Sequence, residues 1–91
     1  MVSSNWEYRL SPTVRMSADR AQGVLLDLAR GKFYGLTAAA VEIAQALVHG
    51  TNFATLLELL QAKFDAPREV LEQDLARFLE ELERAKLCDS S

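Results

Sequence analysis

The chain has 91 residues, of which 49% are hydrophobic and 25% charged, and this composition is typical of one small globular domain over 1–91. Its formal net charge of −3 argues against nucleic-acid binding, because proteins that hold phosphate backbones usually present a basic surface. The single cysteine, Cys88, excludes an internal disulfide. With neither a signal peptide nor an apolar run of ~18 residues that could cross a membrane, we expect a cytoplasmic protein.

The N-terminal part of the chain predicts a short flexible segment followed by a first strand. Residues 1–9 are largely polar and are expected to be flexible. Residues 13–17 alternate weakly between polar and apolar types, which predicts a strand, and residues 19–23 read as a turn.

The next stretch predicts a β-hairpin. Apolar residues alternate with their neighbours over 24–28, the period of a half-buried strand. Residues 29–31 supply the turn, in which Gly31 can adopt a positive φ. Residues 32–36 form the second, aromatic strand of the hairpin.

Three helices are predicted after the hairpin, over about 37–48, 51–64 and 67–86. Thr37 offers an N-cap hydroxyl to the first helix, and Gly50 suits its C-terminal end. The second and third helices each carry a stripe of apolar residues at helical spacing.

The order of elements predicts an α+β fold in which a three-stranded N-terminal antiparallel sheet precedes three helices. This arrangement is winged helix-turn-helix-like. An exposed sheet edge beside the long last helix would form a groove, and an open edge can accept a peptide as an additional strand.

The sequence shows no pattern of catalytic residues, metal ligands or cofactor-binding residues. His49 is the only histidine and falls at a predicted helix end, and Cys88 has no partner at metal-ligand spacing. The segment 67–86 carries four basic and six acidic residues, the wrong balance for a helix lying against DNA. We therefore expect a protein that is not an enzyme and uses no cofactor.

Two stretches resemble the PqqD-like family over about residues 10–88. Gly23–Leu28 followed by Gly31–Thr37 resembles its "LLDL–x–x–GKYYGLN" stretch, and residues 70–82 resemble its "V-x-x-D-V-x-x-F-L-x-x-L" last helix. The second strand lacks the "LLYPEG" run of the pyrroloquinoline quinone precursor chaperones. Ile43 is followed by alanine, where many relatives carry tryptophan.

The resemblance implies a RiPP recognition element, which binds the leader of a ribosomally made precursor peptide and presents it to processing enzymes. A stand-alone chain is most similar to the bacterial recognition protein of lasso-peptide biosynthesis, which works with a leader peptidase and possibly a cyclase. We expect a monomer. The alternatives are a chaperone of the pyrroloquinoline quinone precursor peptide for a radical SAM enzyme, and a winged-helix regulator.

The resemblance places the leader along the strand at 32–36 and against the last helix. Alternation puts Phe33 and Gly35 on one face of this strand and its other apolar residues on the opposite face. On the helix we expect an apolar floor, with Asp74 or Arg77 orienting the leader, although leucine and phenylalanine at this spacing also suit a core. A proline at Tyr34 is expected to abolish binding, either by removing a strand donor or by unfolding the hairpin. The expected peptide-binding residues are Lys32, Phe33, Tyr34, Gly35, Leu36, Val70, Asp74, Leu75, Arg77 and Phe78.

Overall fold

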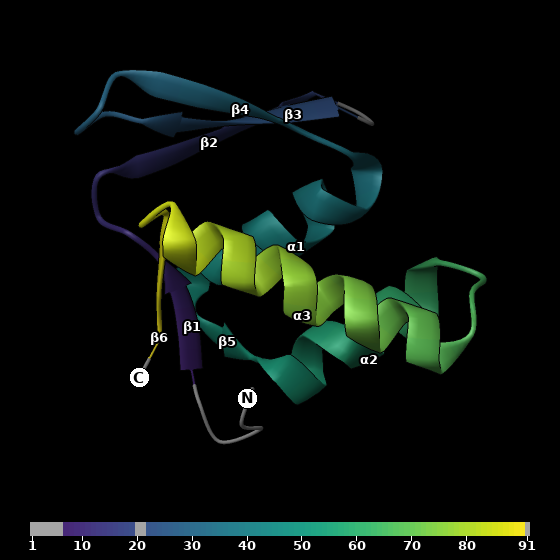
Figure 1. Cartoon of the computed structure of the whole chain (residues 1–91). Helices are drawn as coiled ribbons and strands as arrows, with labels where there is room; N and C mark the ends of the chain where they lie inside the picture. The colour runs from purple at the N-terminus through teal and green to yellow at the C-terminus, as the bar shows by residue number, and fades with distance from the viewer. Residues whose placement is uncertain (1–6, 20–21, 91) are drawn as a thin grey trace.

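The computed structural model describes residues 7–19 and 22–90, which form two small sheets and three helices (Figure 1). Within these ranges no helix is both long and apolar enough to cross a membrane. The elements in chain order are β1 (Glu7–Leu10), β2 (Val14–Asp19), β3 (Gln22–Asp27), β4 (Lys32–Leu36), α1 (Ala38–His49), β5 (Thr51–Asn52), α2 (Phe53–Lys63), α3 (Arg68–Arg84) and β6 (Cys88–Ser90).

The first sheet has the strand order β2-β3-β4 and is antiparallel throughout. Its central strand places Leu25 opposite both Met16 and Tyr34. This sheet and the three helices behind it confirm the predicted α+β, winged-helix-like fold. The turn predicted over 19–23 is shorter, because β2 extends to residue 19 and β3 begins at residue 22, while residues 20 and 21 lie outside the described part.

The second sheet, with the order β5-β1-β6, was not predicted from the sequence. Residues 7–10 form β1, with Tyr8 fully buried, so residues 7–9 of the segment expected to be flexible belong to a strand. Residues 1–6 lie outside the described part. Strands of two to four residues are too short to show an alternating pattern, and their pairing depends on segments far apart in the chain.

The helices begin and end close to the expected residues because their caps are encoded locally. The Thr37 hydroxyl accepts from Ala40 N–H at 3.2 Å, and the Asn52 side chain accepts from Thr55 N–H at 2.8 Å. Gly50 ends α1 with a φ of 85°. The last helix is shorter than the predicted 67–86, because Lys86 has a φ of 61° and turns the chain toward β6.

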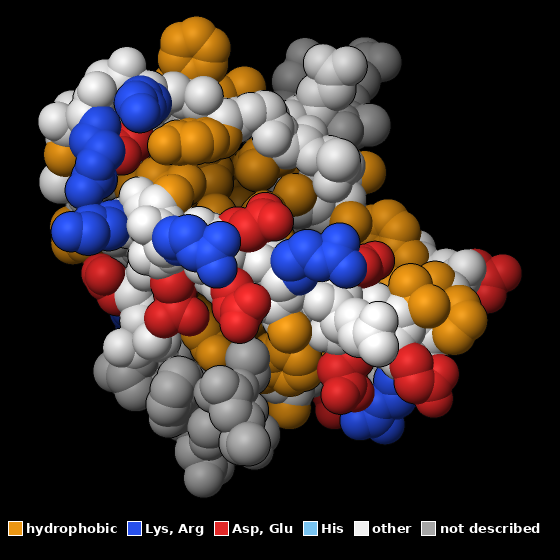
Figure 2. Space-filling model, viewed as in Figure 1, with side chains coloured by type: hydrophobic (Ala, Val, Ile, Leu, Met, Phe, Trp, Pro, Cys, Tyr) orange, Lys and Arg blue, Asp and Glu red, His pale blue; other side chains and the backbone are white. Residues whose placement is uncertain are grey.

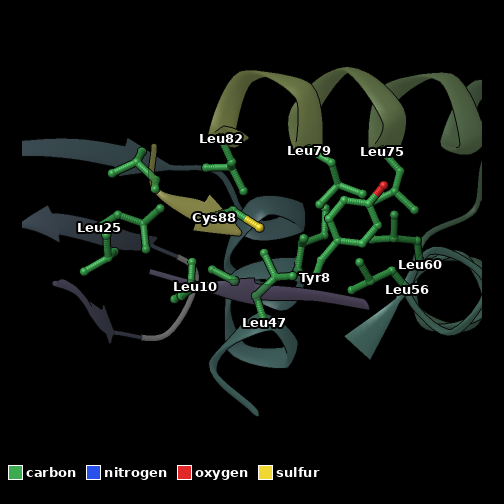
Figure 3. Close-up of a cluster of buried hydrophobic side chains, with 14 of the residues drawn as sticks. Tyr8, Leu10, Leu25, Leu47, Leu56, Leu60, Leu75, Leu79, Leu82 and Cys88 are labelled. Atoms are coloured by element: carbon green, nitrogen blue, oxygen red, sulfur yellow. The ribbon is translucent and has the colours of Figure 1, made fainter. Parts of the chain in front are cut away.

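The hydrophobic core lies between α3 and the other elements (Figure 3). Tyr8 and Leu10 from β1 meet Leu47 from α1 and side chains from α2 and α3. One side of α3 is fully committed to this core through Leu71, Leu75, Leu79 and Leu82. Burial of a leucine contributes ~2 kcal/mol, so this stripe fixes the rotation of α3 about its axis.

The hairpin turn between β3 and β4 is held by a buried carboxylate. Asp27 is 2% exposed, and its Oδ1 accepts from the N–H groups of Ala29 and Arg30 at 3.1 and 3.2 Å. Its Oδ2 accepts from the Arg30 guanidinium at 3.2 Å. Gly31 completes the turn with a φ of 69° and donates its N–H to the Asp27 carbonyl. The side chain of Asp27 therefore sets the geometry from which β4 starts.

Replacing Asp27 with alanine should lower the free energy of unfolding by about 1–3 kcal/mol, because two backbone N–H groups and a guanidinium lose their acceptor. Urea unfolding followed by circular dichroism measures this change. The control is Glu80→Ala on the exposed side of α3, which should change stability by less than ~0.5 kcal/mol. Equal stability of the two variants would contradict this role for Asp27.

The Cys88 thiol should make stability fall at high pH. Burial raises the pKa of Cys88 to about 11 from its ordinary 9.0, so the folded state disfavours the thiolate. This stabilisation is complete below pH 9, where the unfolded thiol is also protonated, and is lost as the pH rises toward 11. We expect the urea midpoint to decrease over that interval, and to decrease less in Cys88→Ala. A midpoint that changes equally in both proteins would contradict this assignment.

Candidate functional site

A groove runs between β4 and α3, on the inner face of the first sheet. It encloses a cavity of about 240 Å³. Figure 2 shows hydrophobic side chains gathered there, with charged side chains following α3 along its border. We call this hollow the β4–α3 groove. It is lined by Leu25, Tyr34, Gly35, Leu36, Phe78, Glu81, Leu82, Ala85 and Leu87.

The hydrogen-bond phase of the sheet determines which backbone groups of β4 are free. Leu28 N–H donates to Thr13 C=O at 2.9 Å, so this pair belongs to the hydrogen-bonded set of the β2–β3 ladder. Hydrogen-bonded pairs alternate with non-hydrogen-bonded pairs along an antiparallel ladder. The backbone N–H and C=O groups of even-numbered residues in β3 therefore point toward β2, and those of odd-numbered residues point toward β4. The odd-numbered residues of β3 pair with Tyr34 and Leu36 in β4, so these two residues bond to β3. The N–H and C=O groups of Phe33 and Gly35 therefore point away from the sheet.

This phase corrects one expectation about β4. Tyr34 was expected to offer its N–H to the leader, but Tyr34 pairs with Leu25 and its backbone faces β3. A proline at Tyr34 would therefore break the hairpin itself. The two residues whose backbone groups are available at the edge are Phe33 and Gly35, which provide two donors and two acceptors.

The opposite edge of the sheet, at β2, is less suited to receiving a strand. Its first outward-facing residue, Val14, already donates its N–H to Ser11 C=O at 3.0 Å. The Val14 carbonyl accepts from the Arg15 guanidinium at 3.2 Å. A basic side chain that covers edge acceptors is a common protection against strand addition. Of the two edges of this sheet, β4 alone borders a groove formed with α3.

The structure brings together four of the ten expected site residues in the groove. These four are Tyr34, Gly35 and Leu36 from β4 and Phe78 from α3. Leu75 is fully buried in the core and does not line the groove, whereas Leu82 of the same leucine stripe both packs in the core and lines the groove.

The other expected residues lie around the groove. Phe33 is 74% exposed on the outer face of the sheet, away from the groove, and Lys32 is exposed at the start of β4. Val70, 46% exposed, lies two turns before Phe78 on α3. Asp74 and Arg77 are exposed and form an ion pair at 3.8 Å, which a ligand can exchange at little cost.

Four lining residues were missed at the sequence level. Leu82 and Ala85 follow Phe78 at spacings of four and seven, so the helical period could have found them. Leu87 follows the helix after the turn at Lys86, and Leu25 reaches the groove from the middle strand. Neither position has a local signal, because both depend on how the sheet packs over α3.

The side chains that line the groove determine what it can hold. Its lining is apolar apart from the Glu81 carboxylate and the Tyr34 hydroxyl. In the described part of the chain, no cluster of three or more histidine, cysteine, aspartate or glutamate side chains is placed to hold a metal ion. An open strand edge over an apolar groove is the geometry by which domains capture an extended peptide.

The family comparison agrees with this class of protein. The family model described as coenzyme PQQ synthesis protein D (PqqD) matches residues 22–87, and the chain belongs to this family. The resemblance noted in the sequence is thereby confirmed. No curated protein sequence matches the chain.

Two solved structures are similar to this chain over most of their length. The first, "TbiB1 in Complex with the TbiA(beta) Leader Peptide", has a TM-score of 0.82 and 27% identity, and covers 89% of this chain and 94% of its own. The second, "Lasso peptide synthetase B1 complexed with the leader peptide", has a TM-score of 0.78 and 26% identity, and covers 90% and 96%. Both of these relatives hold a leader peptide.

The assigned phase of β4 can be tested by amide hydrogen exchange. We expect the N–H groups of Phe33 and Gly35 to exchange rapidly in the free protein, because they face solvent. Those of Tyr34 and Leu36 should be protected by their bonds to β3. The measurement is exchange into D₂O followed by ¹H–¹⁵N NMR. The reverse pattern, with residues 33 and 35 protected, would show that the other set of groups is free.

Proposed function

We propose that this protein binds the leader segment of a ribosomally synthesised precursor peptide by adding it as a strand to β4. The observation that carries the proposal is the free backbone edge at Phe33 and Gly35 directly beside the β4–α3 groove. The similarity to two leader-peptide complexes supports it. The protein would be a non-catalytic recognition element.

The backbone of β4 would supply affinity, and the groove would supply selectivity. Four main-chain hydrogen bonds to Phe33 and Gly35 can form with any extended peptide. Successive side chains of an added strand point to opposite faces, so every second leader residue would enter the groove between Tyr34 and Phe78. An apolar leader residue there would be anchored by burial, and Glu81 at the border would favour a donor or a positive charge nearby.

The first half of α3 would contact a longer leader. Val70, Asp74 and Arg77 lie on α3 before the groove, and a leader that continues past it would reach them. The exposed Val70 would then supply a second apolar contact, and Asp74 or Arg77 would orient the peptide by exchanging their mutual ion pair.

The similarity to lasso peptide synthetase B1 favours a lasso-peptide pathway over chaperoning of the pyrroloquinoline quinone precursor. In such a pathway the protein would present its leader, as a monomer in the bacterial cytoplasm, to a leader peptidase and to the cyclase. The absence of the "LLYPEG" run from the strand at 24–28 agrees with this choice.

Titration of the protein into the fluorescein-labelled leader of a lasso-peptide precursor should give saturable anisotropy. Phe78→Ala should weaken binding about tenfold or more, which corresponds to ~1.4 kcal/mol of lost burial. Because Phe78 also packs against the core, Ala85→Phe, which fills the groove without leaving a cavity, should weaken binding in the same direction.

The matched control is Val48→Ala, which removes an exposed apolar side chain from α1, outside the groove. Its affinity should equal that of the unmodified protein. Absence of binding by the folded, unmodified protein would refute the proposed function. Normal binding by both Phe78→Ala and Ala85→Phe would refute the use of this groove.

A further inference from the structure

Gly35 is a glycine that the isolated protein does not need. Its φ lies outside the left-handed region, unlike those of Gly31 and Gly50. A Cβ built on Gly35 would meet no atom within 4 Å, whereas one on Gly23 would lie 2.6 Å from the Val41 side chain. Glycine within a strand costs about 0.5–1 kcal/mol relative to alanine, and it often marks a position approached by a ligand.

Because Gly35 has no side chain, the outer face of the sheet is accessible from the free edge of β4. Its backbone groups point to the free edge, and its Cβ direction is on the outer face, opposite the β4–α3 groove. The register aligns Gly35 with Val24 and Ser17 in one row across the three strands. A side chain at position 35 would stand between the free edge and this row.

A second hollow lies on the outer face beside this row. It is a depression open to solvent, with a volume of about 570 Å³, and is lined, besides Gly35, by Ser17, Gln22, Gly23, Val24, Leu36 and Thr37. None of these lining residues is charged. Val24 supplies an apolar surface that is partly exposed, and the hydroxyl and amide groups at the rim can accept or donate hydrogen bonds.

We propose that Gly35 is a specificity-determining residue, over which a large uncharged side chain of the leader crosses to rest on Val24 and in the outer hollow. This inference rests on the proposed function. The leader residue paired with Gly35 points its side chain to the outer face, within ~5 Å of the Gly35 Cα, where no Cβ obstructs it. A large side chain that covers a glycine on the adjacent strand is a recognised way of stabilising such positions.

As a consequence, side chains of the leader contact the protein on both faces of the sheet that the leader extends. One residue enters the β4–α3 groove, and a sequence neighbour crosses Gly35 on the other side. A leader with an apolar residue at the first position and a charged or very small residue at the second would bind weakly, even though its backbone could pair with β4.

The test compares the stability and leader affinity of Gly35→Ala and Gly35→Val. Because an added side chain meets open space, both variants should be as stable as the unmodified protein, or more stable, in urea. Their affinity for the fluorescein-labelled leader should nevertheless fall, about threefold for alanine and more than tenfold for valine. Opposite changes in stability and binding separate this role from a merely structural one.

A double-mutant cycle identifies the leader residue involved. An alanine scan of the leader should find one position whose truncation weakens binding to the unmodified protein but has little further effect on Gly35→Val. Alanine at the leader positions on either side of it should instead have little further effect on binding to the Phe78→Ala variant. At the outward position, leucine or phenylalanine should bind more tightly than glutamate.

The outcomes distinguish this inference from the function on which it rests. If the unmodified protein binds the leader and both Gly35 variants bind equally well, the inference is overturned and the proposed function stands. If the unmodified protein binds no leader, both are overturned. Reduced binding together with reduced stability in both variants would also overturn the inference, because the glycine would then serve the fold.

Discussion

Burial of the leucine stripe on α3 is the constraint on which the rest of the site depends. Leu75 and Leu79 pack against Tyr8 from β1 and the side chains of α1 and α2, which leaves α3 no freedom to rotate (Figure 3). The adjacent stripe, with Phe78 and Ala85, then faces β4 across the groove. The depth and apolar character of the groove follow from how the core is filled.

The second constraint is the hydrogen-bond phase of a three-stranded antiparallel sheet. One strand pair sets the phase of the next, so the register of β2 on β3 determines that Phe33 and Gly35 present their backbone groups to the free edge. The Asp27 turn holds this register at the start of β4. An edge strand is ordinarily a liability, and here it is placed where a groove restricts what can pair with it.

The sequence predicted the parts of the structure that are encoded locally. Alternation and turn residues found the hairpin, and the capping residue Thr37 found the start of the first helix. The sheet formed by β1, β5 and β6 was missed, because its strands of two to four residues carry no periodic signal. The order of elements predicted a groove between a sheet edge and the last helix, and the family resemblance placed it at the strand over 32–36. Leu75 was misplaced because one helical period serves both the core and the groove.

In the proposed complex, the leader peptide becomes a fourth strand beside β4. The most direct measurement is amide hydrogen exchange of the ¹⁵N-labelled protein with and without saturating unlabelled leader. If the leader pairs with β4, the N–H groups of Phe33 and Gly35 should gain strong protection, while that of Tyr34, already bonded within the sheet, should change little. Unchanged, rapid exchange at both Phe33 and Gly35 in the saturated complex would show that the leader binds elsewhere or without strand pairing.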